Sequence, residues 1–226
     1  MDGMTKETAL DASIPAVRAR IYSLLAEGFA FPDEEHAAYL KAGYLSAWEE
    51  LLGLLDEEVG LSAPVDRMKA RLRRMDVGSL QEEYVELFEP QGRMAAPPYE
   101  GEYTRYTPQH DLLLSAQLAD VAGFYRAFGV EPSQSCPDRP DHVATELEFM
   151  HLLAAKEAVA AADAQEEHFA VTREAQRKFL GDHLRKWTGP FRDRVGKGRE
   201  GSPYAALAVA VDRWVHYDSE LLGMDA

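Results

Sequence analysis

Apolar residues recur at intervals of three and four along almost the whole chain, the spacing that places side chains on one face of an α-helix. The first such stripe is formed by Ile14, Val17, Ile21, Leu24 and Leu25. Similar stripes follow near residues 46–55, 64–75, 79–88, 107–129, 143–154, 169–187 and 202–221. No segment alternates apolar and polar residues over a useful length. The pattern predicts an all-α protein, a single-domain bundle of about eight or nine helices.

Proline, glycine and capping residues predict where some of these helices begin and end. Pro15, near the start of the first stripe, is suited to a first helical turn because its φ is already helical. Ser79 and Glu82 form a capping-box pattern, which predicts a helix beginning at the serine. Gly189 and Pro190 predict the end of the stripe before them, since proline cannot complete an internal helical hydrogen bond.

Two segments lack the helical period and predict long connections within a single domain of residues 1–226. Residues 89–106 contain glycines, prolines and three tyrosines. Connections of this length are uncommon in compact bundles unless they are functional or disordered, and the tyrosines argue against disorder. Residues 130–141 are predicted to form a second loop or hinge before the next helix.

Composition indicates a globular, acidic protein, with 46% hydrophobic residues, 28% charged residues and a formal net charge of -15. Nucleic acid is therefore not an expected partner, because phosphate binding requires clustered lysine and arginine. Surplus acid instead suits a basic peptide. No apolar run approaches the roughly 20 residues that span a bilayer, and the N-terminus lacks a secretion signal. We expect a cytoplasmic protein that does not insert into membranes.

Metal and catalytic chemistry find little support in the residue pattern. Cys136 is the only cysteine, which excludes an intramolecular disulfide and a thiolate cluster. Glu148 and His151 form one Glu-x-x-His pair, whereas di-iron bundles use two pairs and two further glutamates. His142 and Glu146 could chelate a metal one turn apart, but a third ligand is not evident. We expect no catalytic residue, metal or cofactor; a small helical enzyme or metal-binding protein using these four residues is the alternative.

A polar loop becomes a helix at Asp138-Arg139-Pro140-Asp141-His142. Pro140 suits a first helical turn, and Asp138 or Asp141 could cap it. His142 and Glu146 then lie four residues apart on one helix face. The segment is therefore either a well-capped helix start or a binding site.

Three sequence elements, spread over most of the chain, carry a family resemblance. The first consists of Tyr84, Leu87 and Phe88, followed by Pro97, Pro98, Tyr99, Glu100 and Tyr103. The second consists of Asp138, Pro140, Asp141 and His142, followed by Glu146, Leu147, Phe149 and Met150. The third consists of Phe179, His183, Leu184 and Trp187. In this order they resemble the TorD/DmsD/NarJ family of redox-enzyme maturation chaperones, which are specific for molybdoenzymes.

The resemblance implies a TorD-like, all-helical chaperone that is not an enzyme. Such proteins bind the twin-arginine signal peptide, or a nearby N-terminal segment, of a molybdopterin-containing oxidoreductase subunit. They assist cofactor insertion and assembly, and they delay export until the cofactor is loaded. The chain could be a monomer or a domain-swapped dimer, and a stable accessory subunit is a further alternative. The resemblance does not identify the oxidoreductase.

We expect the peptide-binding surface to combine acids with aromatic side chains. Asp138, Asp141 and Glu146 would face the arginines through charge-assisted hydrogen bonds. His142 would orient the turn or sense protonation, although capping the helix is an alternative role that can coexist with binding. The expected peptide-binding residues are Asp138, Pro140, Asp141, His142, Glu146, Tyr84, Phe88, Tyr99, Glu100 and Tyr103.

Overall fold

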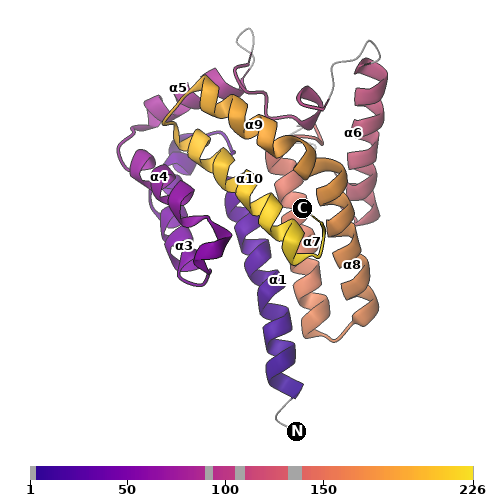
Figure 1. Ribbon diagram of the computed structural model, residues 1–226. Coiled ribbons are helices and arrows are strands. Elements are labelled where there is room, and N and C mark those ends of the chain that lie inside the picture. The colour runs from indigo at the N-terminus through magenta and orange to yellow at the C-terminus, as the bar shows by residue number, and fades with distance from the viewer. Residues whose placement is uncertain (1–3, 90–93, 105–109, 132–138, 226) are drawn as a thin grey trace.

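The computed structural model describes residues 4–89, 94–104, 110–131 and 139–225, with the backbone alone described in 4–13 and 110–113 (Figure 1). The helices in this part of the chain are α1 (Met4–Glu27), α2 (Glu34–Lys41), α3 (Gly43–Leu52), α4 (Ser62–Leu72), α5 (Val77–Phe88), α6 (His110–Ala127), α7 (Val143–Ala162), α8 (Glu166–Phe179), α9 (Arg185–Gly198) and α10 (Pro203–Leu221). Two short 3-10 turns are η1 (Glu57–Val59) and η2 (Glu100–Glu102). A π-helical turn, η3 (Leu180–Leu184), joins α8 to α9 in one helical run. The described residues contain no strand, and the all-α prediction is confirmed.

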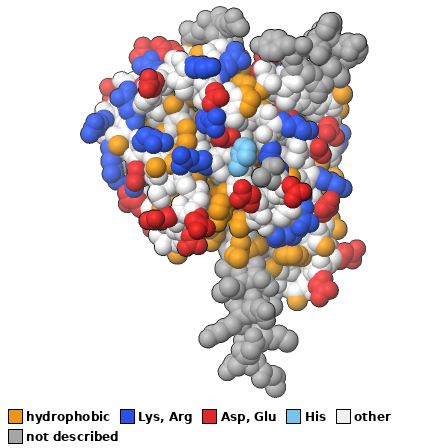
Figure 2. All heavy atoms as spheres, in the orientation of Figure 1, with side chains coloured by type: hydrophobic (Ala, Val, Ile, Leu, Met, Phe, Trp, Pro, Cys, Tyr) orange, Lys and Arg blue, Asp and Glu red, His pale blue; other side chains and the backbone are white. Residues whose placement is uncertain are grey.

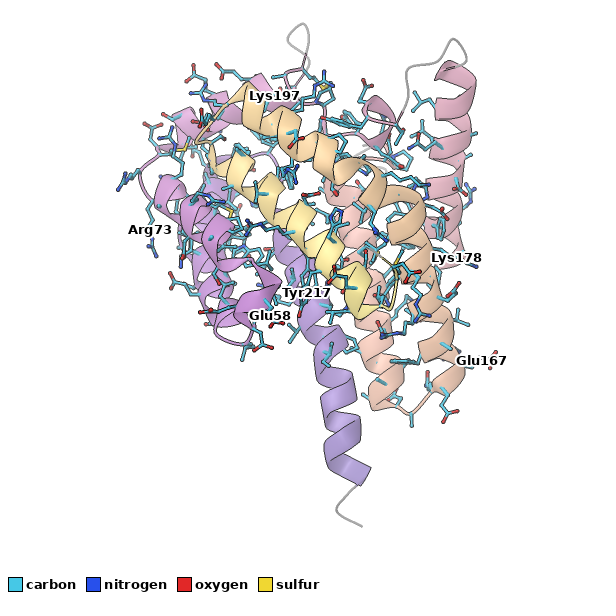
Figure 3. The ribbon with its side chains drawn as sticks, in the orientation of Figure 1. Glu58, Arg73, Glu167, Lys178, Lys197 and Tyr217 are labelled. Carbon is cyan, nitrogen blue, oxygen red and sulfur yellow. The ribbon has the colours of Figure 1, made fainter. Side chains whose placement is uncertain are left out.

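Helices α1 and α7 pack along one another at the centre of the molecule (Figure 1). Helix α8 packs on α7, while α10 packs on both α9 and α4. In Figure 1, α3 and α4 lie on one side and α6 lies on the other, beside the long helices. Charged side chains such as Glu167 and Lys178 on α8 project away from this body (Figure 3). Among the described helices, none is both long and apolar enough to cross a bilayer.

The predicted apolar stripes face a shared aromatic core. Trp48, Trp187 and Trp214 are among the largest fully buried side chains. Phe29 packs against Phe191 with ring centroids 5.7 Å apart, which connects the end of α1 to α9. Aromatic pairs at such separations add stabilisation beyond the burial of apolar area. The core therefore holds together segments that are distant in sequence.

The prediction that Gly189 and Pro190 end a helix was wrong. Helix α9 continues through Pro190 to Gly198. Trp187 and Phe191 on either side of the proline are fully buried. Their packing against the core outweighs the lost backbone hydrogen bond, because tertiary contacts commonly override local propensity.

Two predicted helix starts also differ from the structure. Pro15 lies inside α1 (Met4–Glu27) and not in its first turn. Helix α5 is capped by Asp76, whose carboxylate accepts a hydrogen bond from the Ser79 backbone N–H at 2.7 Å. An ionised aspartate is favoured over serine at this position because it also interacts with the helix dipole. The capping-box pattern therefore identified the correct region and the wrong cap.

A buried charged network joins four helices around Arg18 of α1. The Arg18 guanidinium donates to Glu157 Oε2 on α7 at 2.6 Å and to Asp218 Oδ2 on α10 at 3.0 Å. It also donates to the side-chain oxygen of Gln176 on α8 at 2.6 Å. Burial acts to lower the pKa of Arg18, but the Asp218 and Glu157 carboxylates raise it above its ordinary value. The guanidinium is therefore charged, and it fixes how the four helices meet.

Candidate functional site

The tyrosine-containing connection docks against the start of α7. The Glu100 N–H donates to the Asp141 carbonyl at 3.0 Å, and the Val143 N–H donates to the Pro98 carbonyl at 2.8 Å. Tyr99 and His142 form an isolated antiparallel bridge. The expected loops at 89–106 and 130–141 therefore meet where residues 98–100 contact residues 141–143, and we call this contact the docked turn.

Asp141 is completely buried within the docked turn. Its two carboxylate oxygens accept hydrogen bonds from Arg139 Nε at 2.9 Å and from an Arg139 terminal nitrogen at 2.8 Å. The second oxygen also accepts from the Gly101 backbone N–H at 3.0 Å. Asp141 thus already holds a guanidinium of its own chain in a bidentate arrangement, the strongest geometry for such a pair.

The same arginine also contacts Tyr99 and Glu102 at the docked turn. The Arg139 guanidinium lies over the Tyr99 ring, 4.5 Å from its centroid. It also lies 3.7 Å from a carboxylate oxygen of Glu102. A cation over an aromatic face is attracted by the negative charge of the ring face. Arg139 therefore satisfies acid and aromatic groups that the sequence suggested for a client arginine.

His142 is the N-cap of α7. Its Nδ1 accepts a hydrogen bond from the Ala144 backbone N–H at 3.2 Å, and its ring lies 5.3 Å from that of Tyr99. Accepting at Nδ1 requires that nitrogen to be unprotonated. The segment therefore does cap a helix, as one of the two expectations had it, but the capping side chain is the His142 imidazole and not an aspartate. Asp138, which was expected to cap or bind, lies outside the described residues.

Glu146 lies one turn inside α7 and has no exposed surface. Its Oε2 accepts a hydrogen bond from the Trp187 indole N–H at 3.1 Å. Burial raises the pKa of Glu146 well above its usual range, and the nearby Glu100 carboxylate raises it further. Glu146 therefore lies in the interior and favours the neutral form.

Glu100 extends the docked turn toward the π-helical turn between α8 and α9. The Glu100 carboxylate lies 3.0 Å from His183 Nδ1, and both side chains are almost completely buried. Both residues line an open cavity of about 610 Å³ between η2, α6 and η3. The segment that carries Tyr99 and Glu100 thus contacts the start of α7 through its backbone and this cavity through a side chain.

The aromatic residues expected at the peptide-binding surface lie mostly in the core. Tyr84 and Phe88 of α5 are buried, and their rings pack edge to face at 5.2 Å. Phe88 contacts Phe191, which contacts Tyr103 at 5.9 Å. Tyr103 stacks on Trp187 with centroids 5.6 Å apart. A continuous set of rings therefore connects α5 to Tyr103, the residue that follows η2.

The alternative metal ligands are used in other contacts. His151 Nδ1 lies 2.9 Å from the Ala19 carbonyl, a contact between α7 and α1. Glu148 is exposed, whereas Glu146 is buried beneath the helix start. Within the described part of the chain, no group of three or more histidine, cysteine, aspartate or glutamate side chains is arranged to hold a metal ion.

Comparison with known proteins identifies the family. Residues 41–193 match the family model described as nitrate reductase delta subunit. The chain belongs to this family. It is 31% identical over 205 residues to the perchlorate reductase assembly chaperone protein of Dechloromonas aromatica, covering 88% of this chain and 86% of the relative. It is also 31% identical over 214 residues to the selenate reductase assembly chaperone protein of Thauera selenatis, covering 94% and 93%.

A more distant relative agrees with the expected resemblance to redox-enzyme maturation chaperones, and a solved structure shares the fold. Chaperone protein TorD of Vibrio cholerae is 27% identical over 177 residues, which cover 76% of this chain and 77% of that protein. A redox enzyme maturation protein from Archaeoglobus fulgidus has a similar structure, with a TM-score of 0.51 at 20% identity over 89% of this chain and 93% of that one. The curated relatives are assembly chaperones, so the expected class, a system-specific maturation chaperone, is confirmed. None of them is named as a catalyst.

Three charged residues near the site were missed by sequence reasoning. Arg139 occupies the variable position of its motif, where the sequence alone suggests no role. Asp182 precedes His183 directly, so its position next to a family motif could have drawn attention to it. Asp120 lies on α6 with no motif around it. Only the packing of α6 beside the π-helical turn places it at the cavity.

Proposed function

We propose that this family member is a non-enzymatic, cytoplasmic chaperone for the catalytic subunit of a molybdopterin-containing oxidoreductase. It binds the N-terminal segment of that subunit, with or without a twin-arginine signal, and holds it until the cofactor is loaded. The observation that carries the proposal is the match to reductase assembly chaperones over nearly the full length of both chains.

The docked turn is the proposed centre of the peptide-binding surface. It joins acids and aromatic side chains from two loops, Tyr99, Glu100 and Tyr103 on one and the residues around Asp141 on the other. Asp141 and His142 keep the turn in shape through hydrogen bonds to Arg139, Gly101 and Ala144. The buried Glu146, Tyr84 and Phe88 support this surface from beneath. Pro140 adjoins it, and Asp138, which lies outside the described residues, is proposed as a further binding residue.

Affinity capture from the native cells tests the client class. The full chain, tagged at one end, is isolated, and its bound proteins are identified and assayed for molybdopterin. We expect an oxidoreductase catalytic subunit that lacks the cofactor, and we expect capture to fail when the client's N-terminal segment is deleted. Capture of a mature, cofactor-loaded complex would instead indicate an accessory subunit.

Variants of the docked turn test the surface. Asp141→Asn keeps the shape of the side chain but weakens the pairing with Arg139, and we expect client capture to fall at least severalfold. Asp193→Asn removes one carboxylate from the exposed surface of α9 and serves as the control. Unchanged capture by a folded Asp141→Asn variant would remove the docked turn from the proposal.

A further inference from the structure

The cavity beside Glu100 has an acidic lining. Glu100, Asp120 and Asp182 contribute three carboxylates, while Lys186 contributes one ammonium group. Lys186 Nζ lies 3.6 Å from an Asp182 oxygen, one turn away on the same helical run. The lining therefore retains surplus negative charge, and it favours a cationic ligand.

His183 adds a buried ring nitrogen that has no hydrogen-bond partner within the described part of the chain. It is 2% exposed, and its Nδ1 lies 3.0 Å from the Glu100 carboxylate, which can only accept when ionised. The Nδ1 nitrogen is therefore the protonated one in the neutral ring, and Nε2 presents a lone pair. Among the described residues this Nε2 has no hydrogen-bond partner, and the Asp120 carboxylate lies 3.6 Å from it. Buried polar atoms are normally paired, so this nitrogen is the position at which a ligand N–H donor is wanted.

A guanidinium group supplies both the positive charge and the N–H donor that this cavity favours. It carries one positive charge and five N–H donors with no acceptor, which matches a cavity lined by carboxylates and an imidazole lone pair. Arg139 is not available, because Asp141 and the Tyr99 ring hold it. We propose that this cavity binds an arginine side chain from the N-terminal segment of the client, with His183 Nε2 and Asp120 as its direct partners. This inference rests on the proposed function.

Peptide calorimetry with matched variants tests the site. The probe is a synthetic peptide with an Arg-Arg pair followed by an apolar stretch, together with peptides in which each arginine is replaced by citrulline, its uncharged isostere. For the wild-type chain we expect one replacement to weaken binding about tenfold, the size of one charge-assisted hydrogen-bonded pair. In the Asp120→Asn variant, replacing the same arginine by citrulline should weaken peptide binding by less than about threefold. Asp66→Asn is the control, since the Asp66 and Asp120 side chains are 68% and 65% exposed.

Nitrogen-15 NMR of the histidine side chains provides a second readout on the unmodified chain. We expect the chemical shift of His183 Nε2 to change when the Arg-Arg peptide binds. It should not change with the peptide in which the arginine that binds the cavity is replaced by citrulline. If the peptide binds and the Asp120→Asn variant keeps the full citrulline effect, the arginine lies elsewhere and the cavity assignment is overturned. The proposed function then stands. If neither this peptide nor the captured client's own N-terminal peptide binds the wild-type chain, both proposals are overturned.

Discussion

Single residues at the docked turn have opposite electrostatic environments although they lie close together in sequence. Asp141 accepts hydrogen bonds from a guanidinium and from a backbone N–H. Glu146, one helical turn later, is buried and lies near other acids, so its pKa is raised. Ionising a buried acid such as Glu146 reduces the stability of the folded protein. Its role is therefore testable through pH.

Replacing Glu146 by glutamine should stabilise the protein at alkaline pH. The native state holds the proton of Glu146 to a higher pH than the unfolded state, so stability is lost as pH rises from the unfolded pKa toward the raised native one. Glutamine retains an acceptor for the Trp187 indole and does not ionise. We expect the melting temperature of Glu146→Gln to exceed that of the wild type by a few degrees at pH 8, since about 1 kcal/mol corresponds to about 2–4 °C.

The two proteins should melt alike near pH 4, where the carboxyl group is protonated in the unfolded chain as well. The control is Glu148→Gln, which changes an exposed glutamate two residues further along α7. Equal melting temperatures of Glu146→Gln and the wild type at both pH values would show that Glu146 has an ordinary pKa.

At the scale of elements, Gly101 of η2 lies close both to Leu114 of α6 and to Asp141 before the start of α7. A Cβ atom on Gly101 would lie 2.4 Å from Leu114 Cδ1 and 3.2 Å from the Asp141 carboxylate. The glycine thus allows the close approach that the Gly101–Asp141 hydrogen bond requires. Elsewhere, helices are held in register by the buried charges around Arg18. The close contact at Gly101 and the charged network around Arg18 can be tested separately.

Gly101→Ala should loosen the docked turn. We expect it to destabilise the protein by about 1–3 kcal/mol, the usual cost of overpacking, and to speed hydrogen exchange at the Gly101 amide. The control is Gly123→Ala in α6, where an added Cβ meets nothing within 4 Å. That variant should gain about 0.5–1 kcal/mol, because alanine is the better helix former. Similar unfolding free energies for the two variants would contradict the close contact at Gly101.

Arg18→Met should be far more damaging than the same change at an exposed site. It leaves the carboxylates of Glu157 and Asp218 buried without their cation, and breaking such a pair costs about 3–5 kcal/mol. Arg20→Met, on the same helix with a half-exposed side chain, should change stability by less than about 1 kcal/mol. Urea unfolding measures both values. A small loss in Arg18→Met would mean that the network contributes little to stability.

The whole molecule carries a net charge of -15, but its charges are not evenly distributed. Basic side chains gather on the part of the face in Figure 2 where α4 lies, while acidic side chains are spread over the rest of that face and around its edges. The cavity that we assign to arginine is lined mainly by acids. A basic peptide is therefore attracted by the overall field and directed toward particular surfaces.

Binding of an arginine-containing peptide should depend on salt mainly through its association rate. We expect the association rate constant to fall about tenfold or more between low salt and about 0.5 M salt, with a smaller change in dissociation. Stopped-flow fluorescence with a labelled peptide measures both. The same peptide with citrulline in place of both arginines should show a much flatter salt dependence. A salt dependence confined to dissociation would contradict electrostatic steering.

The sequence alone was sufficient for the all-α class, for most helix positions and for the family. These depend on short-range periodicity and on local motifs, which any reader of the chain can find. Helix ends at Pro190 and Ser79 were misplaced, because core packing at the first and a stronger acidic cap at the second outweighed local propensity. The tertiary structure decided which acidic side chains are available to bind a basic peptide. Asp141 is paired with Arg139, Glu146 is buried, and Asp120 reaches His183 from a distant helix. Arg139 and Asp141 are neighbours in sequence, but the burial of these acids and the contact of Asp120 with His183 depend on residues far apart in the chain, and no local pattern encodes them.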